Sequence, residues 1–591
     1  MTAPGPGDRT GAGTAPDREP GTVTVTAKDH EAEAVTVLFA ARSATALHRL
    51  LDVLPVFAGD QRIRRRFTLV PGSDFGVDAL AAIDRAGART IPWAEARMIS
   101  PGLTLAASPK GAIDELRGPR VLFPHGAGYN KALPAAEAGR SASGLDPRLL
   151  LPGGRPLAAL HVLAHSSQLD RLGAGSPTAA TRAAVIGDPT LDRLLASLPR
   201  RNSYRAALGT GDRRLIVLTS TWGPYSLLAR HPGLPARLVA QLPHDAYQLA
   251  LLAHPNLHSA PGVFDLNEQL APAVNGGLLL ARPYEEWAAL LVAADAVVTD
   301  HGSTALYAAA VGRPLVAACD GGPELIPGTP MAELLSSVPR LESPGDVDLA
   351  VPAPVAAGLA FAERGRSLHR LREELYALLA LTPPDTPAEA RPLPIPPTRP
   401  RTPVAFVVRA GVEGDTVRVV RHPVTVEPHE HVHHLAVELD RGTARHAQGA
   451  GLLFRRPAGE GTASGPHRVT WTAAGWTADV LAAHPGRTRT AAVALAPDHW
   501  IVGRHGLPLL SARIEPSRDP ATGLVIRTDP AAVLSAVHAW LSARPEPPPG
   551  DPDRTGSRTP WLPTVVRCEI AGRRYQARLA VASAGEADTE V

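Results

Sequence analysis

Three short segments of the sequence combine imidazole, hydroxyl and glycine residues directly after expected strands. One contains His125 and ends at Lys131, one begins at His254, and one spans residues 300–304. In parallel α/β sheets, ligands bind beyond the carboxyl ends of the strands, where helix N-termini present unpaired N–H groups. The three segments therefore predict a binding site built from loops at the ends of parallel strands.

The segment 300–304 has the composition expected for a phosphate or pyrophosphate. Gly302 lets the backbone approach a ligand, while Ser303 and Thr304 add hydroxyls to the N–H groups of the following helix. We include Asp300, which opens the segment, among the predicted substrate-binding residues. The alternative is that Ser303 or Thr304 only caps the helix.

His125, His254 and Lys131 each fit a chemical role, and each also fits a purely structural role. An imidazole titrates near neutral pH and accepts a proton, and a second imidazole stabilises charge on phosphate oxygens. His125 and His254, taken singly, are also compatible with structural or surface positions. Lys131 is one of three lysines in a chain rich in arginine, which suggests an anion contact, although an exposed solubilising lysine is the alternative.

The elements that must position these residues follow a βα alternation. Short β-branched runs alternate with Ala/Leu/Arg stretches at helical spacing, which predicts parallel sheets in two similar halves, residues 31–205 and 206–385. An amphipathic helix over 363–381 closes the second half. The strands are expected at 34–40, 67–70, 103–107, 120–123, 159–163, 183–186, 214–219, 247–253, 277–281, 295–299 and 313–318.

The remaining chain divides into other parts. Residues 1–30 have the composition of a disordered leader without a signal-peptide core, and 386–404 contain too many prolines for anything but a stiff linker. Residues 405–591 are expected to form a separate, mostly β domain, with one helix near 531–542. The fold class is thus α/β with two Rossmann-like halves and a mostly β C-terminal domain.

Overall composition excludes several classes of protein. The 591 residues suggest about three to four domains. A net charge of +3 does not indicate a nucleic-acid surface, and no window resembles a membrane helix. The two cysteines, Cys319 and Cys568, allow at most one disulfide, so a reducing, cytoplasmic compartment is expected.

Several motifs together resemble the CDP-glycerol glycerophosphotransferase family of teichoic-acid polymerases, which has the GT-B fold. They are PHGAGYNK (124–131), VIGDPTLDRL (185–194), TSTWGP (219–224), HPN (254–256) and AADAVVTDHGSTALYAAAVGRPLV (293–316). The resemblance covers about residues 31–385. It implies that His125 is the general base for the acceptor hydroxyl and that His254, Ser303 and Thr304 hold the pyrophosphate; Lys131, Ser220 and Thr221 lie in the same motifs and are included as substrate-binding.

The implied function is transfer of a glycerophosphate-like or glycosyl group from a nucleotide-activated donor to a lipid-linked or polymer acceptor of the cell envelope, with peripheral membrane contact. The sequence departs from the family pattern where Trp222 is followed by Gly223 in place of an arginine, and where Asp-His-Gly-Ser replaces Asp-Tyr-Ser-Ser. The donor is therefore left open. A UDP-sugar epimerase, another glycosyltransferase and a non-catalytic nucleotide-binding scaffold remain alternatives.

Metal and cofactor motifs are sparse. Walker, Gly-x-Ser-x-Gly and His-Glu-x-x-His patterns are absent, and residues 346–348 (Asp-Val-Asp) fit a solvated turn, so we expect a reaction without metal or cofactor. In the C-terminal domain, His429, His431 and His433 would share one face of a strand, a spacing that can chelate zinc or copper. An exposed polar strand is the alternative. Trp471 and Trp476 fit either a carbohydrate surface or the core.

Overall fold

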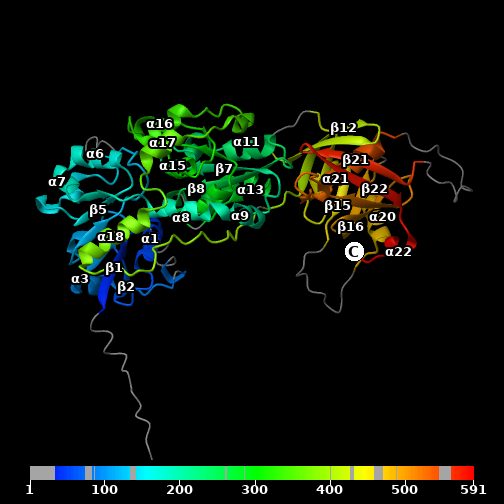
Figure 1. Cartoon of the computed structure of the whole chain (residues 1–591). Coiled ribbons are helices and arrows are strands. Elements are labelled where there is room, and N and C mark those ends of the chain that lie inside the picture. The colour runs from blue at the N-terminus through cyan, green and yellow to red at the C-terminus, as the bar shows by residue number, and fades with distance from the viewer. Residues whose placement is uncertain are drawn as a thin grey trace, which may run out of the picture.

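The computed structural model describes residues 34–72, 83–85, 87–132, 142–259, 263–284, 286–399, 401–425, 431–457, 470–486, 489–544 and 561–591. Within these ranges, two parallel sheets with flanking helices are followed by a closed β-barrel (Figure 1). A mixed α/β architecture with a mostly β C-terminal part is therefore confirmed. The predicted leader, residues 1–30, lies outside the described ranges.

The first sheet has six parallel strands in the order β2-β1-β3-β4-β5-β6. The expected strands agree with it closely, except that β2 begins at Ile63, earlier than predicted. Three arginines after Ile63 hide its apolar alternation, and β2 tolerates them because it is an edge strand with half-buried side chains. The strands are β1 Val35–Ala41, β2 Ile63–Leu69, β3 Leu103–Ala106, β4 Arg120–Leu122, β5 Leu160–Leu163 and β6 Ala183–Val185.

Helices and 3₁₀ turns connect these strands. They are α1 Ala44–Leu51, η1 Leu54–Phe57, α3 Trp93–Met98, η2 Ile113–Glu115, α5 Pro147–Leu150, η3 Pro152–Gly154, α6 Ser166–Gly175, α7 Pro177–Ala180, α8 Pro189–Ser197, η4 Leu198–Arg200 and α9 Arg201–Ala207.

The second sheet has five parallel strands in the order β11-β10-β7-β8-β9. The strands are β7 Arg214–Ser220, β8 Tyr247–Ala253, β9 Leu279–Leu280, β10 Ala296–Thr299 and β11 Leu315–Ala317. The helical elements of this part are α10 Leu227–Arg230, α11 Leu234–Gln241, α12 Pro255–Ser259, α13 Val263–Asn275, α14 Trp287–Ala293, α15 Thr304–Ala310, η5 Gly322–Glu324, α16 Pro330–Ser337, η6 Pro344–Leu349, α17 Pro354–Ala360 and α18 Ser367–Leu379.

Two helical segments pack across the division between the halves. Helix α18 follows the second sheet in sequence, yet Leu371 and Leu375 are buried in the apolar core of the first sheet. Conversely, Leu194 of α8 and Tyr204 of α9 lie in the core of the second sheet. The cores of the two sheets therefore share helices from both sides of the chain connection.

The proline-rich segment after α18 is extended and packed against the protein. Leu393 is buried in the core of the second sheet, its backbone N–H donates to Ser197 Oγ at 2.9 Å, and its carbonyl accepts from Tyr204 Oη at 2.9 Å. Thr398 N–H donates to Glu286 at 2.9 Å. These contacts hold the segment along its route to the barrel.

The C-terminal barrel closes nine strands in the order β12-β13-β21-β22-β18-β17-β16-β15-β14. Most neighbours are antiparallel, while β13–β21, β14–β15 and β15–β16 are parallel. The strands are β12 Ala405–Glu413, β13 Thr416–Pro423, β14 His434–Glu438, β15 Leu452–Arg455, β16 Thr490–Ala496, β17 His499–Arg504, β18 Leu510–Glu515, β21 Thr564–Ile570 and β22 Arg573–Val581, and a separate hairpin joins β19 Ser517–Arg518 to β20 Val525–Ile526.

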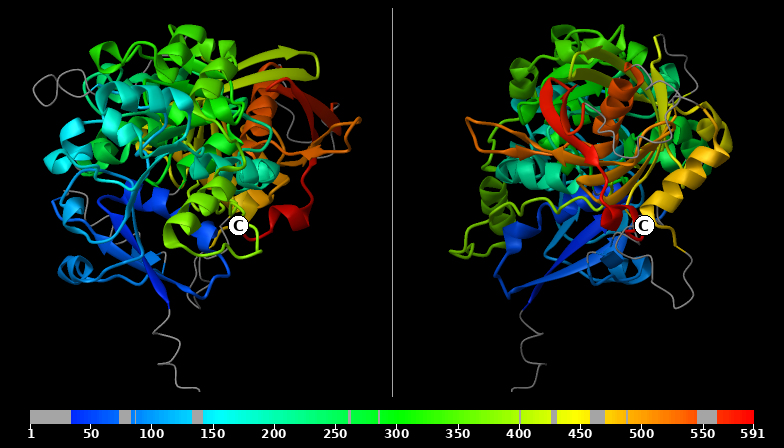
Figure 2. Two further views of the ribbon diagram at one scale, coloured as in Figure 1. Left: turned by 60° about the vertical axis from the view of Figure 1, so that its left-hand side comes forward. Right: turned by 90° about the vertical axis from the view of Figure 1, so that its right-hand side faces the viewer.

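Helix α21, Pro530–Ser542, packs against strands from several sides of the barrel (Figure 2). Residues 531–541 are all buried, as expected for a helix that is apolar around its whole circumference. Helix α20, Ala473–Ala483, covers β16 and β17, and two short helices complete the domain, α19 Ala444–Gly449 and α22 Ala584–Ala587. The predicted helix at 531–542 is thus the one that fills the barrel.

Four smaller expectations also have outcomes. Among the described residues, no helix is long and apolar enough to cross a membrane. Cys319 and Cys568 are buried free thiols. Trp476 is a core residue, whereas Trp471 is 44% exposed. The Asp-Val-Asp sequence forms the 3₁₀ turn η6, in which Asp346 caps its own first turn.

Candidate functional site

Three of the predicted segments follow neighbouring strands of the second sheet. The sheet order places β10 beside β7 and β7 beside β8. The loops that leave these strands begin at Asp300, Thr221 and His254, so parallel geometry brings them to one edge. We call these loops, together with the loop after β4, the inter-sheet site.

Asp300 ties two of these loops together. Its carboxylate is fully buried and accepts backbone N–H groups from Thr221 at 2.9 Å, Leu227 at 2.8 Å and Gly302 at 2.9 Å. Burial raises the pKa of Asp300, while these hydrogen bonds act in the opposite direction. The side chain holds the loops in place, and its predicted substrate contact stays a prediction.

Ser220 also has structural hydrogen bonds. Its hydroxyl accepts from Leu228 N–H at 3.1 Å and donates to the carbonyl of Thr221 at 3.0 Å, and the residue is buried. The side chain of Thr221 is partly exposed at the same turn. Of the two predicted hydroxyls in this loop, that of Thr221 is therefore the more accessible.

The loops of the two sheets meet at Gly126 and Ser303. A Cβ atom on Gly126 would lie 3.0 Å from Ser303 Oγ, so the absence of a side chain permits this close approach. Ser303 occupies the N-cap position of α15 but makes no capping hydrogen bond. Thr304 is the partly buried first residue of that helix. The alternative in which Ser303 serves as a helix cap is therefore wrong.

Glu324 links the two halves beside this contact. Its carboxylate lies 2.9 Å from Lys131 Nζ of the first half and 2.9 Å from Nε2 of the buried His301. The Lys131 ammonium also donates to the Trp222 carbonyl at 3.2 Å. The charge of Lys131 is thus balanced within the protein.

Trp222 and His254 extend the same surface. Lys131 Nζ lies 4.2 Å from the centre of the Trp222 ring, which is 44% exposed and 6.3 Å from the centre of the His254 ring. Nδ1 of His254 accepts the Asn256 N–H at 3.1 Å, so the neutral ring carries its proton on Nε2. His254 therefore presents a donor suited to an anionic oxygen.

His125 has the properties of a base. Its side chain keeps exposed surface, yet the protein around it disfavours the imidazolium, so its pKa is lowered first by this desolvation and next by the positive charge of Arg49. A hydrogen bond to the backbone of Ala107 acts in the opposite direction, as donation to a carbonyl does. That bond leaves the other ring nitrogen as an acceptor.

Arg49 belongs to a buried group that also crosses between the halves. Its guanidinium lies 3.3 Å from the Asp188 carboxylate, and Tyr307 Oη of α15 donates to the same carboxylate at 2.6 Å. The paired charges raise the pKa of Arg49 despite its burial. This group fixes α15, and with it Ser303, relative to the first half.

Sequence reasoning did not single out Arg49, His301, Tyr307 or Glu324. Glu324 had a usable signal, because it follows a Gly-Gly-Pro turn after β11, the neighbour of β10. His301 lay inside a predicted motif. Tyr307 lay inside the same motif, residues 293–316, without a predicted role. Arg49 lies on α1, where no local pattern distinguishes it from a core or surface residue.

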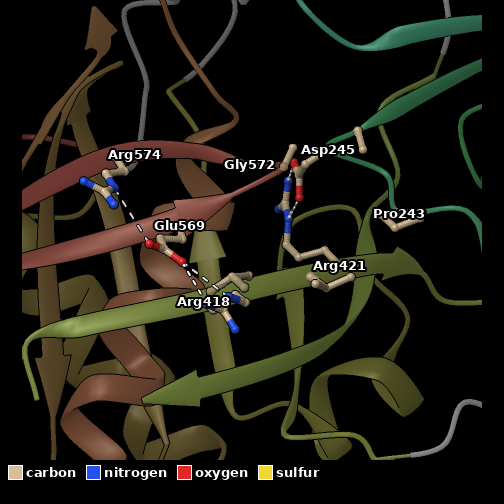
Figure 3. A pocket seen from close by; sticks show the side chains of 11 residues that line it. Pro243, Asp245, Arg418, Arg421, Glu569, Gly572 and Arg574 are labelled. Carbon is tan, nitrogen blue, oxygen red and sulfur yellow. Dashed lines mark hydrogen bonds and ion pairs between the residues drawn. The ribbon is translucent and has the colours of Figure 1, made fainter. Parts of the chain in front are cut away.

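A separate hollow lies between the second half and the barrel (Figure 3). Arg421 of β13 is fully buried there, with its guanidinium 2.6 Å from Asp245 and 3.0 Å from Asp529. At the rim, Glu569 pairs with Arg418 at 3.2 Å and with Arg574 at 3.8 Å. The hollow contains none of the predicted site residues, and its Arg421–Asp245 ion pair joins the barrel to the second half.

The predicted histidine face in the barrel is not formed as expected. His429 lies outside the described residues, and His431 has a positive φ of 56° in a bend. His433 lies instead close to its neighbour His434, the first residue of β14, and to His538 of α21, which is distant in the sequence. Strand alternation did not predict this grouping, because residue 433 precedes the strand.

Comparison with known proteins gives structural matches only. The sequence matches no family model and no curated protein. Solved structures that are similar include the wall teichoic acid polymerase TagF, with 11% identity over 60% of this chain and 91% of that one at a TM-score of 0.40. Anabaena Alr3699/HepE in complex with UDP has 17% identity over 58% of this chain and 100% of that one, with a TM-score of 0.36. MnaA from S. aureus with UDP has 10% identity over 60% of this chain and 99% of that one, with a TM-score of 0.39. A teichoic-acid polymerase is thus among the similar structures, as the motifs of residues 31–385 predict.

Proposed function

We propose that the inter-sheet site binds a nucleotide-diphospho donor and transfers a glycerophosphate-like or glycosyl group to a hydroxyl of a cell-envelope acceptor. The observation that carries this proposal is the approach of the His125-Gly126 loop to Ser303. It supports the proposal because the loop that carries His125 lies beside the loop that carries Ser303, and transfer between two bound substrates requires their sites to adjoin.

His125 acts as the general base. The acceptor hydroxyl loses its proton to the unprotonated ring nitrogen while its oxygen bonds to the transferred group. The bond between that group and a phosphate oxygen of the donor breaks, and the nucleotide leaves with the electron pair. The lowered pKa of His125 keeps the ring unprotonated and ready at neutral pH.

The second half stabilises the negative charge of the leaving nucleotide. His254 supplies an Nε2 donor, and Thr221, Ser303 and Thr304 supply hydroxyls. In this proposal these groups balance the charge without a metal or a cofactor. The exposed Trp222 ring offers a stacking surface for the base or sugar of the donor.

The acceptor is proposed to be lipid-linked or polymeric, with the protein acting in the cytoplasm in peripheral contact with the membrane. Nucleic acid is not a proposed partner. In this proposal, residues 31–205 bind the acceptor and residues 206–385 bind the donor. Residues 405–591 form a third domain, to which no function is assigned.

A thermal-shift screen of CDP-, UDP-, GDP- and ADP-linked compounds tests the donor site. A ligand that binds only the native state raises the melting temperature, and the shift grows with the ligand concentration relative to Kd. We expect one nucleotide class to stabilise the native chain and not the His254→Ala/Ser303→Ala double variant. The matched control, His231→Ala/Ser336→Ala, changes an exposed histidine and an exposed serine elsewhere in the second half and should keep the shift. Equal shifts in both double variants would reject the donor site.

A nucleotide-binding scaffold without turnover is the second candidate. It is favoured by the Lys131–Glu324 pair, which leaves fewer unbalanced cations for a diphosphate, and by Gly223 in place of an arginine. Stoichiometric binding without consumption of donor would support the scaffold. Donor consumption that is lost in His125→Ala would reject it.

A further inference from the structure

Three histidines meet at one end of the barrel, away from the inter-sheet site. One ring nitrogen from each of His433, His434 and His538 lies within 4.8 Å of the others. Nδ1 of His433 is 2.9 Å from Nδ1 of His434, and the ring centres of His434 and His538 are 4.4 Å apart. We call these three residues the histidine cluster.

The fold builds this cluster from separate elements. His434 begins β14, and His433 continues the pairing because its N–H donates to the Val408 carbonyl at 2.8 Å. His538 comes from the helix inside the barrel. The cluster therefore exists only when α21 is packed against the start of β14.

One nitrogen of the cluster lacks a protein partner. His434 is 6% exposed, and its Nε2 atom is buried without a hydrogen bond among the described residues. A buried polar atom in this state carries the cost of lost hydration, so an unpaired one calls for a ligand such as an ion or a water molecule.

Thr490 fixes the orientation of the His538 ring. Thr490 Oγ1, at the start of β16, lies 2.9 Å from Nδ1 of His538. When the ring donates this hydrogen bond, its Nε2 atom carries the lone pair. An outer hydrogen bond of this kind is the usual companion of a metal-ligating imidazole.

Gly451 leaves the space that the cluster occupies. A Cβ atom there would lie 2.9 Å from Nε2 of His538 and 3.0 Å from Cβ of His434. Any side chain at this position would therefore crowd the His538 ring and the Cβ atom of His434.

We propose that His433, His434 and His538 bind one divalent transition-metal ion, with Zn²⁺ as the fitting case. Tetrahedral zinc with histidine ligands places their nitrogens about 3.3 Å apart. One nitrogen from each of the three rings lies within 4.8 Å of the others, which is close to this spacing. His433 lies at the exposed side of the cluster and leaves that side open to solvent. The site is therefore a three-histidine site with an open position, the arrangement used where zinc binds water or substrate.

The charges around the histidine cluster determine how tightly it binds a divalent metal ion. No carboxylate joins the three histidines among the described residues, so a bound dication keeps its charge. Arg421, the arginine whose charge acts on His434, is paired with Asp245 and Asp529. Binding is therefore expected to be saturable and weaker than in a site of thiolate ligands.

Titration of the untagged, chelator-stripped full chain with Zn²⁺ tests the proposal, with Co²⁺ absorption as a second reading of coordination. We expect one ion per chain in the native protein and roughly tenfold or greater weakening in His433→Ala, whose exposed side chain is not needed for folding. His538→Gln should lose binding as well. His505→Ala, an exposed histidine of the same domain, is the matched control and should bind as the native chain does.

His431→Ala separates this cluster from the local histidine run. The proposal requires unchanged binding in His431→Ala and loss of binding when the native chain is unfolded in urea. Binding that falls in His431→Ala, persists in urea or survives in His433→Ala would overturn the cluster as the metal site, and so would the absence of stoichiometric binding in the native chain.

Discussion

The inter-sheet site and the histidine cluster both present imidazoles, but in opposite surroundings. His125 keeps exposed surface and a hydrogen bond to backbone, so it can meet a substrate and exchange a proton. In the cluster, His434 and His538 are buried, and burial lowers the pKa of His538 to about 3. The first arrangement suits proton transfer, whereas the second suits neutral nitrogen ligands.

The two regions also differ in how the fold assembles them. The inter-sheet site collects loops that leave adjacent parallel strands, so strand order alone brings Thr221, His254 and Asp300 together. The cluster depends on a helix packed inside a barrel. A polar group can therefore be placed by topology at a sheet edge, while inside a barrel it is placed by side-chain packing.

The largest expected effect separates the two regions by function. His125→Ala should lower donor turnover by about 10²- to 10⁴-fold, because the acceptor proton loses its base. Zinc binding by the same variant should be unchanged, since the cluster shares no residue with the inter-sheet site. Steady-state kinetics measures donor turnover, and zinc titration of the same preparation measures metal binding. Turnover equal to that of His231→Ala, an exposed-histidine control, would contradict the assignment of the base.

The second-largest effect is expected at the contact between the second half and the barrel, the parts that contain the two regions. Arg421→Met leaves the buried Asp245 without its cation, while Asp529 keeps its ion pair with Arg456 at 2.7 Å, so we expect a loss of about 3 kcal/mol in the free energy of unfolding. Arg418→Met is the matched control at the rim of the same hollow (Figure 3), where its partner is Glu569. An exposed pair contributes about 1 kcal/mol or less. Urea unfolding measures the free energy of unfolding of both variants. An equal loss of this free energy in the two variants would show that Arg421 does not hold the barrel against the second half.

A smaller effect is expected at Glu324. Glu324→Gln removes a negative charge beside the proposed diphosphate and releases Lys131 from its ion pair. Nucleotide affinity should rise about fivefold at low salt, and the gain should shrink as salt is added. Isothermal titration at two salt concentrations measures this, with Glu333→Gln on α16 as the control. A fall in affinity would mean that Glu324 positions His301 and Lys131 for binding.

Much of this fold was predictable because it rests on local patterns. Buried parallel strands such as β8 and β10 are short apolar runs, and the loops after them hold the predicted residues. The edge strand β2 was predicted too short because its arginines face solvent in part. The sharing of α18 with the first core was not predictable, since its apolar stripe does not specify which sheet it covers.

The candidate site was predictable in its residue types and less so in their roles. Asp300 and Ser220 looked like ligand contacts, but their oxygens accept or donate hydrogen bonds within the protein. Arg49 lies outside the motifs and Tyr307 lies inside one without a predicted role, because both act through a long-range contact with Asp188. In the barrel, the pairing of His433 with His538 depends on packing that no local spacing encodes.

The smallest expected effect is a shift in the pH profile of the proposed reaction. The pKa of His125 is lowered, so kcat/KM should fall only as pH drops through a midpoint below 6.5, where the ring becomes protonated. Among the charges that lower this pKa is that of the exposed Lys110. Lys110→Gln removes it, which favours the imidazolium and moves the midpoint upward by roughly a few tenths of a pH unit, less at high salt. Arg155→Gln, an exposed control in the same half, should leave the midpoint in place. A midpoint that moves equally in both variants would show that the titrating group is not His125.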